Sequence, residues 1–269
     1  MLTSLRVAPR PVALGRVLFA IGALLTCYEG GGFLNHLQKD RITTPVSDWL
    51  PQAADVSLAA WFLTMAVACV LLALGILAPL SALTIAAGNV LLMATDQQLY
   101  SNHRFFLVVL CLWFAIARAD RAWAVRAKVR RDAGDGLVPW WPQLLLVATL
   151  SACYLFAGLS KANPEFLSGD LIASLSPDWV PAQATAWLTV PTEIAIGLGL
   201  WWRRTRRPAL LLGVLLHVSI VALLGAPLVF SAFALLCFAS YPLVWTWPTF
   251  PAGPEDQAEA AAIQRSNVA

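Results

Sequence analysis

Apolar residues lie along this chain in long runs that short polar segments separate. A helix needs about 20 apolar residues to cross the hydrocarbon core of a bilayer. With that length as the measure, the pattern predicts eight membrane-spanning helices, with the ranges 12–32, 54–78, 79–100, 103–119, 139–160, 182–202, 208–225 and 227–247. The predicted fold is an all-α polytopic membrane helix bundle. One transmembrane domain covers residues 1–250, and a short polar tail, 251–269, is expected to be disordered.

The composition supports the same class. Hydrophobic residues make up 59% of the 269 residues, charged residues make up 12%, and the mean hydropathy is +0.70. A single water-soluble core of this size cannot bury so large an apolar fraction. The lipid bilayer is therefore an expected partner, and the small net charge of +3 gives no indication of nucleic-acid binding. The five cysteines lie singly in apolar runs, without the spacing of a metal site, so we expect no bound metal.

Basic residues cluster after the fourth and the sixth predicted span. Loops rich in arginine and lysine stay preferentially on the cytoplasmic side, so both chain termini are predicted to be cytoplasmic. The segments 33–53, 96–103 and 161–181 then face outward. Aromatic and proline residues in the two longer segments predict interfacial helices and turns on the outer face. The basic residues are Arg118, Arg121, Arg126, Lys128, Arg130, Arg131, Arg203, Arg204, Arg206 and Arg207.

Several polar side chains lie inside or at the ends of the predicted spans, where hydrocarbon makes them costly. They are Glu29, Asn89, Asp96, Asn102, His103, Lys161, Glu193 and His217. The predicted topology puts Glu29, Asp96, His103 and Lys161 at the outer ends of four helices. Glu193 and His217 are placed nearer the midplane. We therefore expect a polar funnel that opens outward and a pocket that Lys161 and His103 share.

Each of these residues also has a structural interpretation. An ammonium at a low-dielectric boundary is costly, so Lys161 either extends to the headgroups or gives up its proton more easily and becomes a base. Glu193 and His217 can pair with each other simply to hold two helices together. The step from Asn102 to His103 can be an ordinary helix cap. Only the combination of these residues favours a functional site.

A motif in the fifth predicted span resembles a known family. The run Tyr154-x-x-Ala157-Gly158-x-x-Lys161, followed by Phe166 and Gly169, is similar to the lysine motif of the vitamin K-dependent gamma-carboxylase superfamily. The membrane part that these proteins share is called the horizontally transferred transmembrane (HTTM) domain. Further elements occur in the family's order over residues 15–245, namely Arg16, Glu29, Asn102 with His103, Glu193 and His217.

The resemblance implies a chemistry. Lys161 would be the base that deprotonates a reduced naphthoquinone, so that oxygen can convert this cofactor into a strong base. His103, next to Asn102, would assist proton transfer at the substrate. The first hypothesis is therefore a quinol-linked oxidative enzyme. The residues that the resemblance assigns to the cofactor pocket are Glu29, Tyr154, Gly158, Glu193 and His217.

Two departures from the family pattern limit this hypothesis. Phe166 stands where the family motif has tryptophan, which keeps the aromatic ring but loses the indole N–H donor. The carboxylases also carry a large extramembrane part that grips the peptide substrate, whereas this chain ends at Ala269, shortly after the last predicted span. Peptide carboxylation by this chain alone is therefore not expected, and a companion protein would have to supply the missing part.

Two other function classes stay open. Small bacterial relatives of the family resemble proteins that help to mature a secreted toxin, which places the expected location in a bacterial inner membrane. The second hypothesis is therefore a non-catalytic membrane partner that binds, matures or protects against a secreted peptide. Transport is the third hypothesis, because acids and histidines in a membrane also form proton relays. The spans show no paired halves with broken helices, which disfavours transport.

Overall fold

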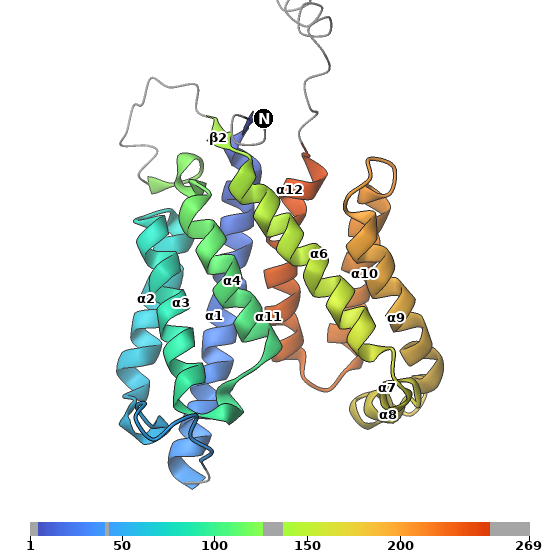
Figure 1. Cartoon of the computed structure of the whole chain (residues 1–269), viewed down its shortest axis with the longest axis horizontal. Coiled ribbons are helices and arrows are strands. Elements are labelled where there is room, and N and C mark those ends of the chain that lie inside the picture. Colours follow the sequence, from blue (N-terminus) through green and yellow to red (C-terminus); the bar gives the residue numbers. More distant parts are fainter. Residues whose placement is uncertain (1–4, 41–42, 126–136, 248–269) are drawn as a thin grey trace, which may run out of the picture.

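The computed structural model describes residues 5–40, 43–125 and 137–247, and these form a bundle of helices that run between the same two ends (Figure 1). Each of the eight predicted segments contains a helix. The helices are α1 (Pro9–Asp40), α2 (Leu58–Leu74), α3 (Ala78–Thr95), α4 (Asn102–Ile116), α6 (Trp141–Lys161), α9 (Ala182–Gly199), α10 (Arg206–Leu223) and α11 (Pro227–Phe238), which α12 (Tyr241–Trp245) follows after a short break. The predicted tail, 251–269, lies outside the described residues.

The lengths and compositions of these helices agree with a multi-pass membrane protein. Within the described part of the chain, five helical stretches are long and apolar enough to cross a membrane: Pro9–Lys39, Ala78–Thr95, Trp141–Lys161, Arg206–Leu223 and Pro227–Trp245. Helices α2 and α4 are apolar but shorter. Helix α9 has 18 residues and contains Gln183, Pro191 and Glu193. The membrane bundle is thus supported, whereas the count of eight crossings stays a prediction.

Some helix boundaries differ from the predicted ones. Helix α1 continues to Asp40 instead of ending at residue 32, because its glycines stay helical. One of them, Gly30, lies so close to α4 that a β-carbon there would be 2.9 Å from Nη2 of Arg104. Helix α3 ends at Thr95 rather than at residue 100, because Asp96 adopts an extended backbone with φ −155°. A short 3-10 helix, Gln97–Leu99, follows Asp96. The Asp96 carboxylate caps it by accepting from the backbone N–H of Gln98.

The connections between the helices gather at two ends of the bundle. One end, here called the β1–β2 end, holds the short strands β1 (Arg6–Val7) and β2 (Val138–Pro139), the turn between α9 and α10, and α12 (Figure 1). The strands pair antiparallel, with Val7 opposite Val138. The other end, here called the α7–α8 end, holds α7 (Pro164–Leu167) and α8 (Asp170–Leu175). These two short helices occupy the segment 161–181, where interfacial helices were predicted.

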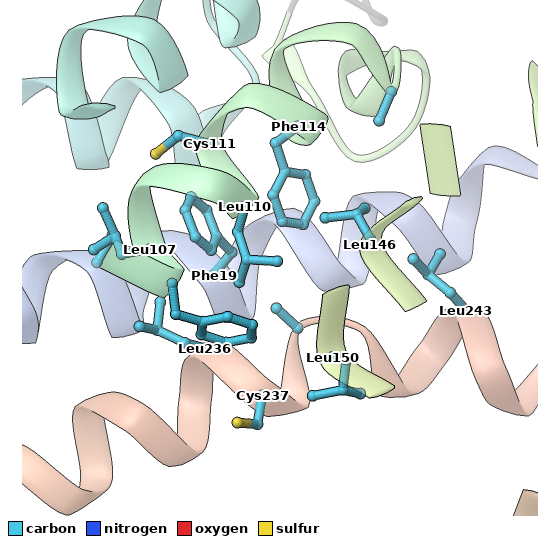
Figure 2. Packing of buried hydrophobic residues seen from close by; sticks show 14 of the residues in the cluster. Phe19, Leu107, Leu110, Cys111, Phe114, Leu146, Leu150, Leu236, Cys237 and Leu243 are labelled. Atoms are coloured by element: carbon cyan, nitrogen blue, oxygen red, sulfur yellow. The ribbon is translucent and has the colours of Figure 1, made fainter. Parts of the chain in front are cut away.

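Helix α1 lies inside the bundle and packs against α2, α4, α11 and α12. Buried side chains of α1, α4, α6 and α11 interlock there (Figure 2). The rings of Phe19 and Phe114 stack with their centres 4.7 Å apart. Leu110, Leu150 and Leu236 are fully buried in the same cluster. This cluster fixes the helices whose ends carry the polar residues described below.

A buried arginine joins three chain segments at the β1–β2 end. Arg16 of α1 is fully buried, and its guanidinium donates to the carbonyl oxygens of Ala73, Ala119, Ala122 and Trp123 at distances from 2.5 to 3.3 Å. These carbonyls belong to the end of α2 and to the chain that follows α4. The last carbonyl groups of a helix have no partner within the helix, so a guanidinium with several donors satisfies them well.

Candidate functional site

Lys161, the last residue of α6, forms an ion pair with Glu193 of α9. Its Nζ lies 2.9 Å from both Oε1 and Oε2 of that carboxylate. The Lys161 side chain is 30% exposed, whereas that of Glu193 is only 8% exposed. The amine therefore does not simply extend to the headgroups: the carboxylate holds it, and part of it remains accessible.

Small residues bring α6 and α9 close enough for this contact. A β-carbon at Gly158 would lie 2.9 Å from Cγ1 of Ile194 and 3.1 Å from the carbonyl oxygen of Val190. Elsewhere along the same two helices, Ser151 donates through its hydroxyl to the carbonyl oxygen of Gly197 at 2.7 Å. Gly158 was predicted to belong to a cofactor pocket. In the structure it makes helix packing possible and thereby places Glu193 opposite Lys161.

The segment after Lys161 folds back over the pair. Asn163 caps α7 by accepting from the backbone N–H of Phe166 at 2.9 Å. The ring centre of Phe166 then lies 5.9 Å from Nζ of Lys161, which is within the range of a cation–π contact. Gly169 has a φ of 87°, and a β-carbon there would lie 2.6 Å from the backbone nitrogen of Gln183. This position therefore requires glycine.

A second acid–base pair lies at the start of α4. Nε2 of His103 is 2.6 Å from Oε2 of Glu29 in α1, and the two side chains are 14% and 8% exposed. Nη2 of Arg104 lies 4.0 Å from the same carboxylate oxygen, and its Nη1 donates to the carbonyl oxygen of Leu99. A carboxylate that contacts one ring nitrogen fixes the orientation of the imidazole. Glu29 thus holds the His103 imidazole at the start of α4.

Asn102 does not join this pair. The Ser101 hydroxyl caps α4, and Asn102 is the first residue of the helix. The Asn102 side-chain oxygen accepts from the hydroxyl of Tyr100 at 3.4 Å. The helix cap therefore lies one residue before the Asn-His step, at Ser101.

A cavity adjoins the Glu29 carboxylate. It has a volume of about 710 Å³ and lies along α1, beside the start of α2 and the start of α11. Aromatic and aliphatic side chains dominate its lining, among them Tyr28, Phe33, Phe62 and Leu228, together with Glu29 and His36. A mostly apolar cavity with few polar groups is typical of a small-molecule site. Neither Lys161 nor His103 lines this cavity.

A third polar group is buried between α6, α10 and α12. The Tyr154 hydroxyl lies 2.8 Å from Nε2 of His217 and 2.8 Å from the hydroxyl of Tyr241. The rings of Phe233 and Phe238 are each centred 5.5 Å from the imidazole and enclose it. The structural interpretation of His217 and Glu193 was a pair that holds two helices together. They have different partners instead, because His217 points to Tyr154 and Glu193 to Lys161.

The polar residues that were expected in a single funnel therefore form separate groups, each with its own contacts. Lys161 and His103 lie at the end of α6 and the start of α4, on the same α7–α8 end of the bundle (Figure 1). Across the described residues no hydrogen bond or ion pair joins them. The turn between α10 and α11 lies between the two groups: Gly225 donates its N–H to the carbonyl oxygen of Leu175 in α8, while Leu228 lines the Glu29 cavity.

Two residues expected in the funnel have structural partners instead. Asp96 is fully buried, and it accepts from the backbone N–H of Thr44 at 2.7 Å and from the Thr44 hydroxyl at 3.0 Å. It therefore fixes the segment between α1 and α2. Asn89 donates to the carbonyl oxygen of Ile85 at 2.9 Å, inside its own helix α3. Neither residue contacts Lys161 or His103 in the part of the chain that the structure describes.

Two contributors to these groups were missed at the level of sequence. Arg104 directly follows the Asn-His pair at the start of an apolar helix. An arginine at such a position already indicates that a polar partner lies nearby. Tyr241 gave no signal, because a lone tyrosine in an apolar helix is common. Over the described residues, no group of three or more His, Cys, Asp and Glu side chains has the arrangement of a metal site.

Comparisons with known proteins agree with the resemblance seen in the motif. The model of the family described as "HTTM domain" matches residues 6–246, which is nearly the whole chain. No curated protein and no solved structure matches the sequence. The family match includes every polar residue described above.

Proposed function

The chain belongs to the HTTM-domain family, and from that premise we propose that it is a membrane enzyme that removes a proton from an apolar, hydroxyl-bearing compound. The observation that carries this proposal is the ion pair of Lys161 and Glu193, with Nζ 2.9 Å from both carboxylate oxygens. A catalytic base has to be held in place and still be reachable by its substrate. Glu193 holds the amine of Lys161, and 30% of the lysine side chain is exposed.

The two residues take up a proton as a unit. In the ionised pair the carboxylate of Glu193 accepts the proton, and in the neutral pair the amine of Lys161 accepts it. Both routes end with an ammonium beside a carboxylic acid. The ammonium then lies next to the oxyanion that remains on the substrate and stabilises it. The capacity to accept a proton therefore belongs to the pair rather than to either residue.

A reduced naphthoquinone is the hydroxyl compound that the sequence resemblance implies. When bound, this group supplies an ionisable hydroxyl on an aromatic ring that oxygen can oxidise. The residues next to Lys161 fit such a ring. Phe166 presents its own ring 5.9 Å from Nζ and packs against the apolar cluster of Ile172, Val180 and Ala186. A flat aromatic compound beside Phe166 would have its hydroxyl within reach of the amine.

His103 has the supporting role in this proposal. Glu29 orients the imidazole at 2.6 Å, and the cavity of about 710 Å³ beside Glu29 gives room for a second reactant. Glu29 lines that cavity and His103 does not, so His103 exchanges a proton with the reactant through the Glu29 carboxylate, while Asn102 shapes the first turn of α4. Tyr154 and His217 fix α6 against α10 and thereby hold the end of α6 where Lys161 lies.

A second candidate function is a non-catalytic membrane partner for a secreted peptide. The Glu29 cavity favours it, because the cavity lies at the α7–α8 end and its apolar lining would accept a hydrophobic peptide side chain. In that case the polar groups serve recognition and stability. Lys161 would not be needed for binding, since it does not line the cavity.

The experiment is naphthoquinol oxidation by the purified chain in detergent, followed by absorbance. We expect Lys161→Met to lower turnover by about 10² to 10⁴ fold, which is the usual contribution of a positioned base. Glu193→Gln should give a loss of similar size, and His103→Ala a smaller one. Lys39→Met is the matched control, because Lys39 lies in the last turn of α1 at the same end of the bundle. It should leave turnover unchanged.

The same protein preparations decide between the two functions. Full turnover in Lys161→Met protein would overturn the enzymatic proposal, as would the absence of quinol oxidation by the unaltered chain. A peptide that co-purifies equally with the unaltered protein and with Lys161→Met protein would favour the binding role.

We also infer that the β1–β2 end faces the cytoplasm of a bacterial inner membrane. The N-terminal strand and the basic turn with Arg203, Arg204, Arg206 and Arg207 lie together at this end (Figure 1). Reporter fusions after residue 247 test the orientation. A reporter that is active only outside the cytoplasm should be silent there, and its activity would contradict the assignment.

A further inference from the structure

A second large cavity lies at the β1–β2 end, on the opposite side of the bundle from the Lys161–Glu193 pair. It has a volume of about 620 Å³ and is bounded by the first turns of α1, the start of α10, and α11 with α12. The proposed chemistry uses none of its lining residues. This cavity is therefore independent of the proposed function.

The cavity carries positive charge. Arg10 of α1 and Arg207 of α10 line it, and none of the lining residues is acidic. The guanidinium of Arg207 lies over the ring of Trp245, with Cζ 4.7 Å from the ring centre. This contact fixes the arginine side chain at the cavity. Helix α10 begins at Arg206, so the partial positive charge of its N-terminus adds to that of the two arginines.

The rest of the lining is apolar. The lining includes Leu14 and Leu18 of α1, Leu210 and Val214 of α10, and Phe238 of α11. These residues lie inside three of the helical stretches that are long and apolar enough to cross a membrane. The cavity therefore extends from the charged rim toward the depth of the hydrocarbon.

Two tryptophans complete the site. Trp123 and Trp245 line the cavity, and they are 58% and 57% exposed. Exposed tryptophan is characteristic of the level of the headgroups, where an apolar ring with one polar atom is favourable. The charged rim therefore lies at the depth that lipid phosphates occupy.

We propose that this cavity binds an anionic phospholipid, with the phosphate between Arg10 and Arg207 and an acyl chain along Leu14, Leu18 and Val214. The two arginines complement the charge of the headgroup. The apolar wall complements the chain, and it would stay unfilled if a small soluble anion were bound. Basic pockets between membrane helices are the usual sites for lipid headgroups of this kind.

The experiment is native mass spectrometry of the full chain, titrated in detergent with phosphatidylglycerol and, separately, with phosphatidylcholine. The variant Arg10→Gln/Arg207→Gln should weaken phosphatidylglycerol binding by about 30-fold, which corresponds to about 2 kcal/mol for two arginines near the headgroup. The control Arg203→Gln/Arg204→Gln removes the same charge at the same end, from residues that do not line the cavity. It should change the affinity by about twofold or less.

A third variant tests the apolar wall without altering charge. Val214→Trp fills the cavity and should prevent phosphatidylglycerol from binding, while the unfolding midpoint in lipid-free detergent shows whether the fold is intact. Equal losses in the cavity variant and the control would overturn the proposal. Equal binding of the two lipids, or displacement of the lipid by millimolar inorganic phosphate alone, would overturn it as well.

Discussion

Gly158 of α6 and Ile194 of α9 are in direct contact, because a β-carbon at position 158 would lie 2.9 Å from Cγ1 of the isoleucine. Glu193 immediately precedes Ile194, so this contact also sets the distance between the Glu193 carboxylate and Lys161. The ion pair is one consequence of how closely the two backbones approach each other.

We therefore predict that Gly158→Ala destabilises the protein by about 1–3 kcal/mol, the usual effect of overpacking a close contact. The measurement is the free energy of unfolding in mixed micelles. Gly32→Ala is the matched control, because Gly32 is also helical and a β-carbon there would meet nothing within 4 Å. The control should be neutral or stabilising, since alanine favours helix more than glycine does. Equal effects of the two changes would contradict the prediction.

The energetic link between Lys161 and Glu193 can be measured by a double-mutant cycle. Lys161→Met and Glu193→Gln should each destabilise the protein, because each leaves a polar partner behind at a poorly solvated position. The double variant should lose less free energy of unfolding than the sum of the two single losses. The difference, the coupling energy, should be about 0.5–3 kcal/mol. Additive effects would show that the 2.9 Å contacts do not persist in solution.

Arg16 tests the importance of guanidinium geometry. Arg16→Lys keeps the charge but cannot reach four carbonyl oxygens at once, since an ammonium has three donors on a single atom. We expect a destabilisation of at least about 3 kcal/mol, because several hydrogen bonds to a charged group are lost. The readout is thermal unfolding in detergent. Arg203→Lys, at an exposed position, serves as the control and should have almost no effect.

Tyr154 joins His217 and Tyr241 through one hydroxyl. Tyr154→Phe removes both hydrogen bonds, whereas Tyr241→Phe removes only the bond between the two tyrosines. We predict a loss of about 1–3 kcal/mol for Tyr154→Phe and a smaller loss for Tyr241→Phe. Tyr100→Phe, at a side chain that is 54% exposed, should be close to neutral in the same unfolding experiment. The prediction is wrong if Tyr241→Phe is the more damaging change.

The helices of this protein follow from its sequence, because runs of apolar residues of membrane length have few alternatives to a helix. The short helices α7 and α8 lie where aromatic and proline residues predicted interfacial structure. Boundaries were harder to predict. Nothing local indicates that Gly30 stays helical, since its conformation depends on contact with Arg104, which is distant in sequence.

The buried polar residues could be identified from the sequence, but the contacts between them could not. Lys161, Glu193, Glu29, His103 and His217 were all identifiable as polar residues in apolar surroundings. Which of them meet depends on helix rotation and on the separation between helix axes. Both are set by small residues such as Gly158, whose packing role cannot be recognised before the neighbouring helix is known.

The four carbonyl oxygens that Arg16 holds have a mechanical consequence. Through these hydrogen bonds Arg16 connects α1, α2 and the chain after α4 into one unit, at the end of the bundle that is remote from Lys161. The opposite end has no such clamp in the described residues, and there two helices of four and six residues connect α6 to α9, so we infer that the proposed substrate enters at that end.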